Sequence, residues 1–131
     1  MIQLKFPQGV FVSNGQVYIA DSGNHRVRKL LHNGQIVTIA GTGKKGYNGD
    51  GQLAVNAQLN YPSSVIVSSS NQVYIAEMDG HRIRKIDQNG IISTIAGTGE
   101  DGYSGDGQLA VHSKLYRPRG LFVTEDELHF S

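Results

Sequence analysis

The 131-residue sequence contains no cysteine, which excludes disulfide bonds, thiolate metal sites and cysteine nucleophiles. An excess of charge of one sign is also lacking, because 12 Lys and Arg stand against 11 Asp and Glu, for a formal net charge of +1. A near-neutral chain has no large field to attract nucleic acid or an anionic membrane. From the composition we therefore do not expect a nucleic-acid partner.

Long hydrophobic runs are missing as well. The first residues read MIQLKFPQGVFVSNG and reach Pro7 early, so we expect neither a signal peptide nor a membrane-spanning helix. Absence of cysteine is compatible with either redox environment, and no targeting motif is visible. The sequence thus leaves the cellular compartment undetermined.

Glycine is abundant, with 17 residues, and a search for internal repeats explains why. The segment VYIADSGNHRVRKL at residues 17–30 returns as VYIAEMDGHRIRKI at residues 73–86, and TIAGTG and GDGQLAV recur with the same shift. A third copy starts at Arg117, where RPRGLFVTEDELHFS matches FPQGVFVSNGQVYIA. We therefore expect a single repeat segment over residues 1–131, with units at about 6–60 and 61–116 and a partial unit at 117–131.

Each unit predicts four short antiparallel strands and no substantial helix. The alternating stretches GVFV and VYIA are typical of two strands joined by a polar turn, and HRVRKL and IVTIAG supply two more. Asn33-Gly34 between the last two favours a type I′ hairpin turn, because both residue types tolerate positive φ. The predicted fold class is all-β, with β-propeller blades of four antiparallel strands.

The repeated segments resemble NHL repeats. The resemblance rests on VYIADSGNHRVRKL, on TIAGTG and on the connector GYNGDGQLAVNAQLNYP, and its closest variety is the long-connector one of teneurin-like and bacterial multi-repeat proteins. It implies a six-bladed propeller, of which this chain supplies two full blades plus two strands of a third. The sequence departs from the pattern at residues 77–80, where EMDG replaces DSGN, and at Ser64, which replaces a glycine.

An incomplete ring predicts further partners. Propeller blades bury their faces against neighbouring blades, so a short array leaves two apolar faces bare. We expect further blades of the same fold, from a longer protein or from copies of this chain, and three copies with two blades each would make a homotrimeric ring of six.

Residues that recur in both units are expected to serve each blade rather than a unique site. Arg26, Arg28 and Lys29 recur as RxRK at residues 82–85, and we expect their salt bridges to go to Asp21 or Glu77. Tyr47 recurs as Tyr103 and is predicted to anchor the connector between blades. The predicted structural set is Asp21, Asn24, His25, Arg26, Asp50, Glu77, His81, Arg82 and Asp106.

Two loop motifs resemble ligand-binding loops, but other residues in or equivalent to each loop do not fit the ligand. Gly41, Gly43 and Gly46 have the spacing of a phosphate-binding loop, but the second copy carries Glu100 and Asp101, which would repel phosphate. Aligning the NGDG segment with an EF-hand loop places a glycine at position one and an alanine at position twelve, where carboxylates are required. An irregular calcium site remains an open alternative, and no cofactor is expected.

The 5 histidines raise the question of a metal. His25 and His81 are equivalent and have no partner nearby in sequence at ligand spacing, whereas His32, His112 and His129 stand far apart. A site on the propeller axis, of the kind that the zinc-binding amidating-lyase propeller implies, would draw most of its ligands from blades outside this chain. No catalytic or metal-binding residue is therefore predicted.

Positions that differ between the units mark where specificity is expected, because connecting loops carry function on rigid scaffolds. They form the candidate interaction surface of Lys44, Lys45, Met78, Glu100, Asp101, His112, Tyr116, Arg117 and Arg119. The resulting hypothesis is a non-catalytic scaffold that binds a protein or a glycan. Two alternatives stay open, a metal-dependent lyase- or lactonase-like propeller enzyme and an RNA-binding propeller that uses the recurring basic residues.

Overall fold

The computed structural model describes residues 3–102, 109–124 and 127–131. It contains ten strands and three single-turn 3-10 helices: β1 (Pro7–Ser13), β2 (Gln16–Asp21), η1 (Ser22–Asn24), β3 (Arg26–Leu30), β4 (Ile36–Ala40), η2 (Ala54–Asn56), β5 (Pro62–Val67), β6 (Val73–Glu77), β7 (Arg82–Ile86), β8 (Ile92–Ala96), η3 (Ala110–His112), β9 (Leu121–Thr124) and β10 (Glu127–Phe130).

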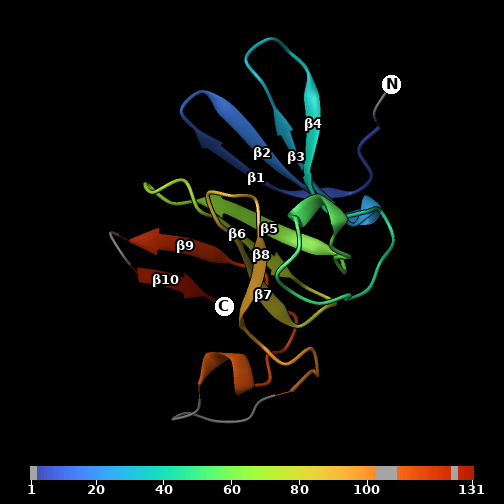
Figure 1. Ribbon diagram of the computed structural model, residues 1–131, viewed down its shortest axis with the longest axis vertical. Coiled ribbons are helices and arrows are strands. Elements are labelled where there is room, and N and C mark those ends of the chain that lie inside the picture. The colour runs from blue at the N-terminus through green and yellow to red at the C-terminus, as the bar shows by residue number, and fades with distance from the viewer. Residues whose placement is uncertain (1–2, 103–108, 125–126) are drawn as a thin grey trace.

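The strands form antiparallel sheets in sequence order. Strands β1-β2-β3-β4 make one 4-stranded sheet, here blade 1, and β5-β6-β7-β8 make another, here blade 2, while β9 and β10 form a 2-stranded sheet. Figure 1 shows the three sheets side by side, with the β9–β10 pair next to blade 2. The prediction of propeller blades with two full copies and two strands of a third is confirmed.

The turns of the hairpins differ from the prediction in one respect. The hairpin between β3 and β4 is present, but Leu31 N–H donates to the Gln35 carbonyl at 2.8 Å, which leaves three residues in the loop. Gly34 alone then takes positive φ, at 88°, and Asn33 does not. The type I′ prediction is wrong there, because a three-residue loop needs only one left-handed residue at its end.

A two-residue turn with both central residues left-handed occurs instead between β1 and β2. Ser13 pairs directly with Gln16. Asn14 and Gly15 between them have φ of 52° and 75°. The type I′ geometry therefore follows the loop length and not the Asn-Gly pair alone.

The core lies between the blades. Its main cluster includes Val27 and Ala40 of blade 1 together with Val65 and Ile75 of blade 2, and Leu59 of the connector is 0% exposed within it. A smaller cluster joins blade 2 to the third sheet. Stacking of blades, rather than folding of a single sheet, thus removes the apolar side chains from water.

One face of blade 1 is bare. Val10 and Val12 are 66% and 63% exposed, whereas Val65 and Val67, which hold the same places in blade 2, are 2% and 8% exposed. The difference arises because blade 1 covers β5, and no described residue covers β1 in the same way. None of the helices in the described part of the chain has the length and apolar character needed to cross a bilayer.

These equivalent valines give a matched test of blade stacking. Val65→Ala should lower the free energy of unfolding by about 1–2 kcal/mol, since it removes buried methyl groups, whereas Val10→Ala should change it by less than about 0.5 kcal/mol. Chemical denaturation of both variants measures the difference. Equal losses for the two variants would show that β1 is covered in solution.

Candidate functional site

A buried acid–arginine pair lies at the centre of each blade. Asp21 at the end of β2 is 0% exposed, and Arg28 on β3 donates to it from Nε at 3.1 Å. The second Asp21 oxygen accepts the Lys5 backbone N–H at 2.7 Å. In blade 2, Glu77 and Arg84, both 0% exposed, pair at 2.8 Å. These pairs confirm the salt bridges expected for Arg28 and Arg84, whereas Arg26 and Arg82 donate to the carbonyls of Thr42 and Thr98.

Burial of the Glu77 carboxyl group disfavours its charged form. Loss of water raises the pKa of Glu77 above its ordinary value, and the attraction of Arg84 opposes this only in part. A hydrogen bond from the Asn60 backbone N–H at 2.7 Å further favours the charged form. The paired arginine and this N–H together stabilise a carboxylate that is fully buried.

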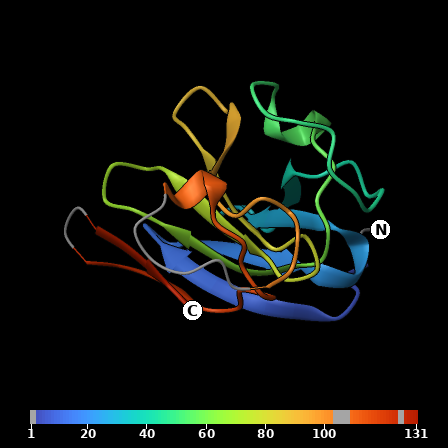
Figure 2. The ribbon, with the colours of Figure 1, turned by 90° about the horizontal axis from the view of Figure 1, so that it is seen from below.

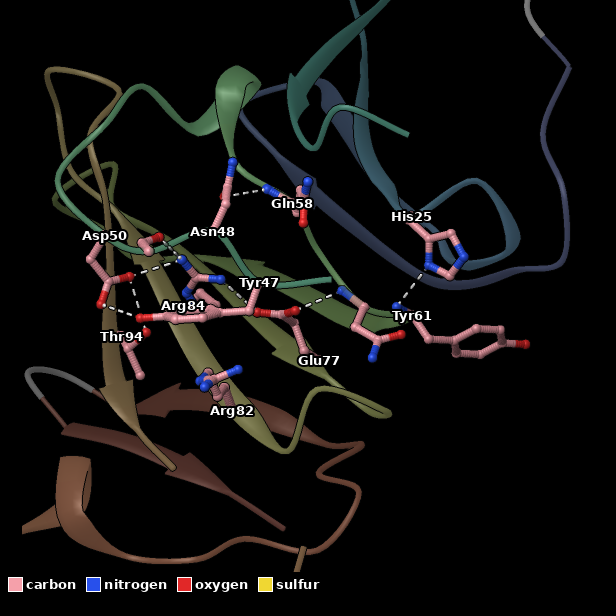
Figure 3. A network of polar contacts seen from close by, with 12 residues as sticks. His25, Tyr47, Asn48, Asp50, Gln58, Tyr61, Glu77, Arg82, Arg84 and Thr94 are labelled. Atoms are coloured by element: carbon pink, nitrogen blue, oxygen red, sulfur yellow. Dashed lines mark hydrogen bonds and ion pairs between the residues drawn. The ribbon is translucent and has the colours of Figure 1, made fainter. Parts of the chain in front are cut away.

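The connector of blade 1 completes the charge cluster of blade 2. Asp50 accepts from Arg84 Nη2 at 2.8 Å and from Thr94 Oγ1 at 3.0 Å (Figure 3). The Tyr47 ring lies 3.6 Å from the guanidinium carbon of Arg82. The prediction that Tyr47 anchors the connector between blades is confirmed, while Tyr103 and Asp106 lie outside the described residues.

Histidines occupy equivalent places at the junctions between blades. His25 follows η1 with φ of 53°, and its Nδ1 accepts the Tyr61 N–H at 3.0 Å (Figure 3). His81 has the same φ, and its Nδ1 accepts the Arg117 N–H at 3.0 Å. Each histidine therefore ties the turn between the second and third strands of one blade to the segment that begins the next repeat unit.

Protonation opposes the His25 contact, because an accepting Nδ1 must carry no proton. Burial lowers the pKa of His25 from its ordinary value of 6.5, and the neighbouring charge of Lys45 lowers it further. The junction between blades 1 and 2 is thus stable with a neutral imidazole.

Close packing explains the glycines of the phosphate-like motif. Arg26 Nη2 donates to the Thr42 carbonyl at 2.7 Å, and Arg82 does the same to Thr98 at 3.0 Å. A Cβ on Gly43 would lie 2.6 Å from the guanidinium carbon of Arg26. The loop is therefore shaped around an arginine of its own blade.

Apart from Met78, the candidate interaction residues fall into three groups. Lys44 and Lys45 are exposed on the loop after β4. Glu100 and Asp101 are exposed at the equivalent place after β8, and Glu100 pairs with Lys114 at 3.3 Å. The two loops thus carry opposite charges at matching positions of adjacent blades.

The third group precedes β9. Tyr116 is 66% exposed and stacks on His81, with ring centroids 6.1 Å apart. Arg117 reaches Asp79 at 3.4 Å. Arg119 is exposed, and His112 is exposed at the end of η3. These side chains belong to the segment from η3 to β9, which follows blade 2 in the chain.

Met78 differs from the other candidates, because it is only 8% exposed. Its N–H donates to the Tyr61 carbonyl at 3.0 Å, in the turn after β6. Sequence difference between repeats does not report burial, so its inclusion in an interaction surface is corrected here.

An open groove of about 700 Å³ runs along the inner strands β1, β5 and β9. Its polar lining includes Gln8, Ser64, Ser68 and Arg119. Within residues 3–102, 109–124 and 127–131, no three His, Cys, Asp or Glu side chains gather in a metal-binding arrangement. The groove therefore combines these polar groups with apolar side chains such as Val10, Phe11 and Leu121.

Serine hydroxyls form a further contact between blades that the sequence did not indicate. Ser22 Oγ donates to the Pro62 carbonyl, and Ser63 Oγ donates to the Pro118 carbonyl at 3.1 Å. The two serines stand at different places in their units, so comparison of the repeats could not find them. The proline that recurs at the start of each unit was the available signal.

Comparison with known proteins bears on this architecture directly. The family described as Teneurin NHL domain matches residues 33–104, more than half of the chain, and the NHL repeat family matches residues 4–30. This chain belongs to the NHL-repeat family. The resemblance of the repeated motifs to NHL repeats is confirmed.

Several proteins share the NHL sequence pattern. NHL repeat-containing protein 2 of Gallus gallus is 38% identical over 107 residues, which cover 79% of this chain and 14% of that protein. SUPPRESSOR OF QUENCHING 1, chloroplastic, of Arabidopsis thaliana is 38% identical over 90 residues, covering 67% of this chain and 8% of that protein. Teneurin-3 of Danio rerio is 35% identical, and the match covers 66% of this chain and 4% of that protein. The chain spans a small part of each relative.

Solved structures support the same fold for the NHL chain. An auxiliary nutrient binding protein from Bacteroides thetaiotaomicron superposes with a TM-score of 0.67 at 22% identity, covering 88% of this chain and 31% of that one. Virginiamycin B lyase from Staphylococcus aureus gives 0.60 at 18% identity, covering 95% and 34%. Identities this low carry the fold alone.

The connector contact can be tested with a neutral substitution. Asp50→Asn should lower the free energy of unfolding by about 1–2 kcal/mol, because Arg84 stays buried and loses one of its two anions. Asp101→Asn, a surface control, should change it by less than about 0.5 kcal/mol. Urea denaturation at pH 7 compares them, and equal stability of Asp50→Asn and the unmodified chain would contradict a stabilising connector.

The histidine junction predicts a pH dependence with a definite sign. Since the folded pKa of His25 lies below 6.5, its contribution to stability is full above 6.5 and is lost as the pH falls through the folded pKa. His25→Asn should flatten this part of the curve of melting temperature against pH. Lys45→Gln should shrink the loss, and Lys44→Gln serves as the control that leaves it unchanged. A curve that His25→Asn leaves unaltered would refute this origin.

Proposed function

We propose that this chain is a non-catalytic segment of an NHL propeller that acts as an interaction scaffold for a protein or a glycan. The observation that carries the proposal is that repeated and unrepeated positions differ in their contacts and exposure. Recurring residues such as His25, Arg26 and Glu77 are used in contacts within and between blades. Most of the positions that differ between the units remain exposed for a partner.

The loops that follow β4 and β8, here called the rim loops, carry charged side chains. Lys44 and Lys45 follow β4, and Glu100 and Asp101 hold the equivalent places after β8. Neighbouring blades thus present opposite charges on loops of the same kind. A partner with complementary charges would be oriented by this alternation, because electrostatic complementarity fixes register more than affinity.

Engagement of the basic residues weighs against RNA as the partner. Arg28 and Arg84 are buried and paired with carboxylates, and Arg26 donates to a carbonyl of its own loop. Guanidinium groups in such contacts are not available to phosphates. Interaction through the rim loops is the use that leaves these pairs intact.

Further blades would complete the scaffold. The bare Val10 and Val12 support a preceding blade, and the exposed Phe130 lies on the unfinished third sheet. Three copies of this chain would supply six blades, but β9 and β10 lie against blade 2, where the first blade of the next copy would pack. Further repeats continuing this ring need no such displacement, so they fit better than a homotrimer.

Reversal of rim charge tests the scaffold proposal. A ligand would be selected on protein and glycan arrays with the unmodified chain, and its affinity then measured for Lys44→Glu/Lys45→Glu. The expected result is a loss of about tenfold or more, while Lys44→Arg/Lys45→Arg, which keeps the charge, binds as the unmodified chain does. Light scattering on each sample establishes the mass of the binding species.

Two results would overturn the proposal. The first is an affinity that neither the Lys44/Lys45 reversal nor Glu100→Lys/Asp101→Lys changes. The second is steady turnover of a small substrate by the purified chain, because a scaffold has no chemical step to accelerate.

A further inference from the structure

Blade 2 has a carboxylate cradle that a segment from outside its sheet fills. Arg84 uses Nη1 for Glu77 at 2.8 Å and Nη2 for Asp50 at 2.8 Å. The Thr94 hydroxyl donates to the same Asp50 oxygen at 3.0 Å. Asp50 therefore enters a place prepared by two side chains of the sheet, as Figure 3 shows.

The backbone of the same connector pairs with the outer edge of blade 2. Gly51 N–H donates to the Ile92 carbonyl at 2.8 Å, Ile92 N–H donates to Gln52 at 3.0 Å, and Ala54 N–H donates to Gly90 at 2.8 Å. Figure 2 places the connector beside the β7–β8 hairpin. Addition of a segment to an unpaired sheet edge is a common mode of peptide recognition.

Blade 1 carries the same three residue positions as this cradle, but its guanidinium binds the acid through Nε and not through Nη1. Arg28, Asp21 and Thr38 hold the places of Arg84, Glu77 and Thr94. The Arg28 side chain is 8% exposed and donates from Nε to Asp21 and from Nη1 to the Thr38 hydroxyl. No residue in the described part of the chain accepts from its Nη2, so this nitrogen still has donors for a carboxylate.

The strand edge beside this cradle is open as well. No described residue pairs with β4 in the way that the connector pairs with Gly90 and Ile92. Ile36 is only partly buried, whereas the equivalent Ile92 is 0% exposed. A charged cradle, a hydroxyl and a free strand edge thus coincide in one place.

We propose that Arg28, Thr38 and the β4 edge at residues 34–36 form a docking site for the Gly-Asp-Gly connector of a repeat that precedes blade 1 in the ring. The site takes one carboxylate on Arg28 Nη2 and pairs the flanking backbone with the strand edge. This inference rests on the proposed function, since it assumes a ring completed by further blades, and it names the contact that joins them.

An aromatic contact specifies the occupant further. Tyr47 stands three residues before Asp50 in the connector. Its ring lies 3.6 Å from the guanidinium carbon of Arg82 in blade 2. Arg26 holds the place of Arg82 and is fixed in the same way to its loop carbonyl. The occupant of blade 1 therefore carries Tyr-x-x-Asp, with the ring on Arg26 and the carboxylate on Arg28.

The probe is a synthetic peptide with the sequence GYNGDGQLAVNA of residues 46–57, titrated into the full chain and followed by NMR. The expected result is a shift of the Arg28 Nε–H signal together with slower amide exchange at Ile36, the counterpart of Ile92. A peptide with Asp→Asn should bind at least about tenfold more weakly, because it loses a charge-assisted bond to a buried arginine. A Tyr→Ala peptide tests the contact with Arg26 separately.

Because the changes are made in the peptide, the test leaves the buried Arg28–Asp21 pair of the protein intact. Equal binding of the Asp and Asn peptides would overturn the proposal, and so would changes confined to blade 2. Self-association of the chain that the peptide reverses would also overturn it, since the occupant would then be a second copy. Failure here with intact rim-dependent ligand binding would leave the proposed function standing, so the two are distinguishable.

Discussion

The buried guanidinium of Arg84 sets the constraint on which the arrangement of the blades depends. A charge without water must be matched by anions and hydrogen-bond acceptors, or the structure around it is unstable. Glu77 supplies one anion from the same sheet, and Asp50 supplies another from a connector 34 residues away in sequence. Blade 2 therefore depends on its neighbour for a hydrogen-bond acceptor on the buried guanidinium as well as for apolar burial.

The residues that hold the blades together differ from those that are exposed on the loops. The recurring acids, arginines and histidines are used in contacts within each blade and between one blade and the next. Specific chemistry is then left to the loops, and the loops after β4 and β8 carry opposite charges. A rigid ring with variable loops suits a scaffold, because loop changes do not disturb the contacts that hold the blades together.

Comparison of two copies in one chain shows which features belong to a blade and which to its surroundings. Arg28 and Arg84 occupy the same place and bind an acid of their own sheet. Their surroundings differ, since only blade 2 has a preceding connector within the described residues. Val10 and Val65 differ in exposure for the same reason. Blade 2 thus indicates the environment that blade 1 would have inside a complete ring.

The sequence by itself determined the repeat, the strands, the NHL family and the acid–arginine pairs, because these depend on local periodicity and on recurrence at a fixed spacing. Only the tertiary structure decided that Met78 is buried, that Asp50 belongs to Arg84, and that His25 joins two blades. Such contacts depend on how segments far apart in sequence meet when blades stack, and no local pattern records that meeting.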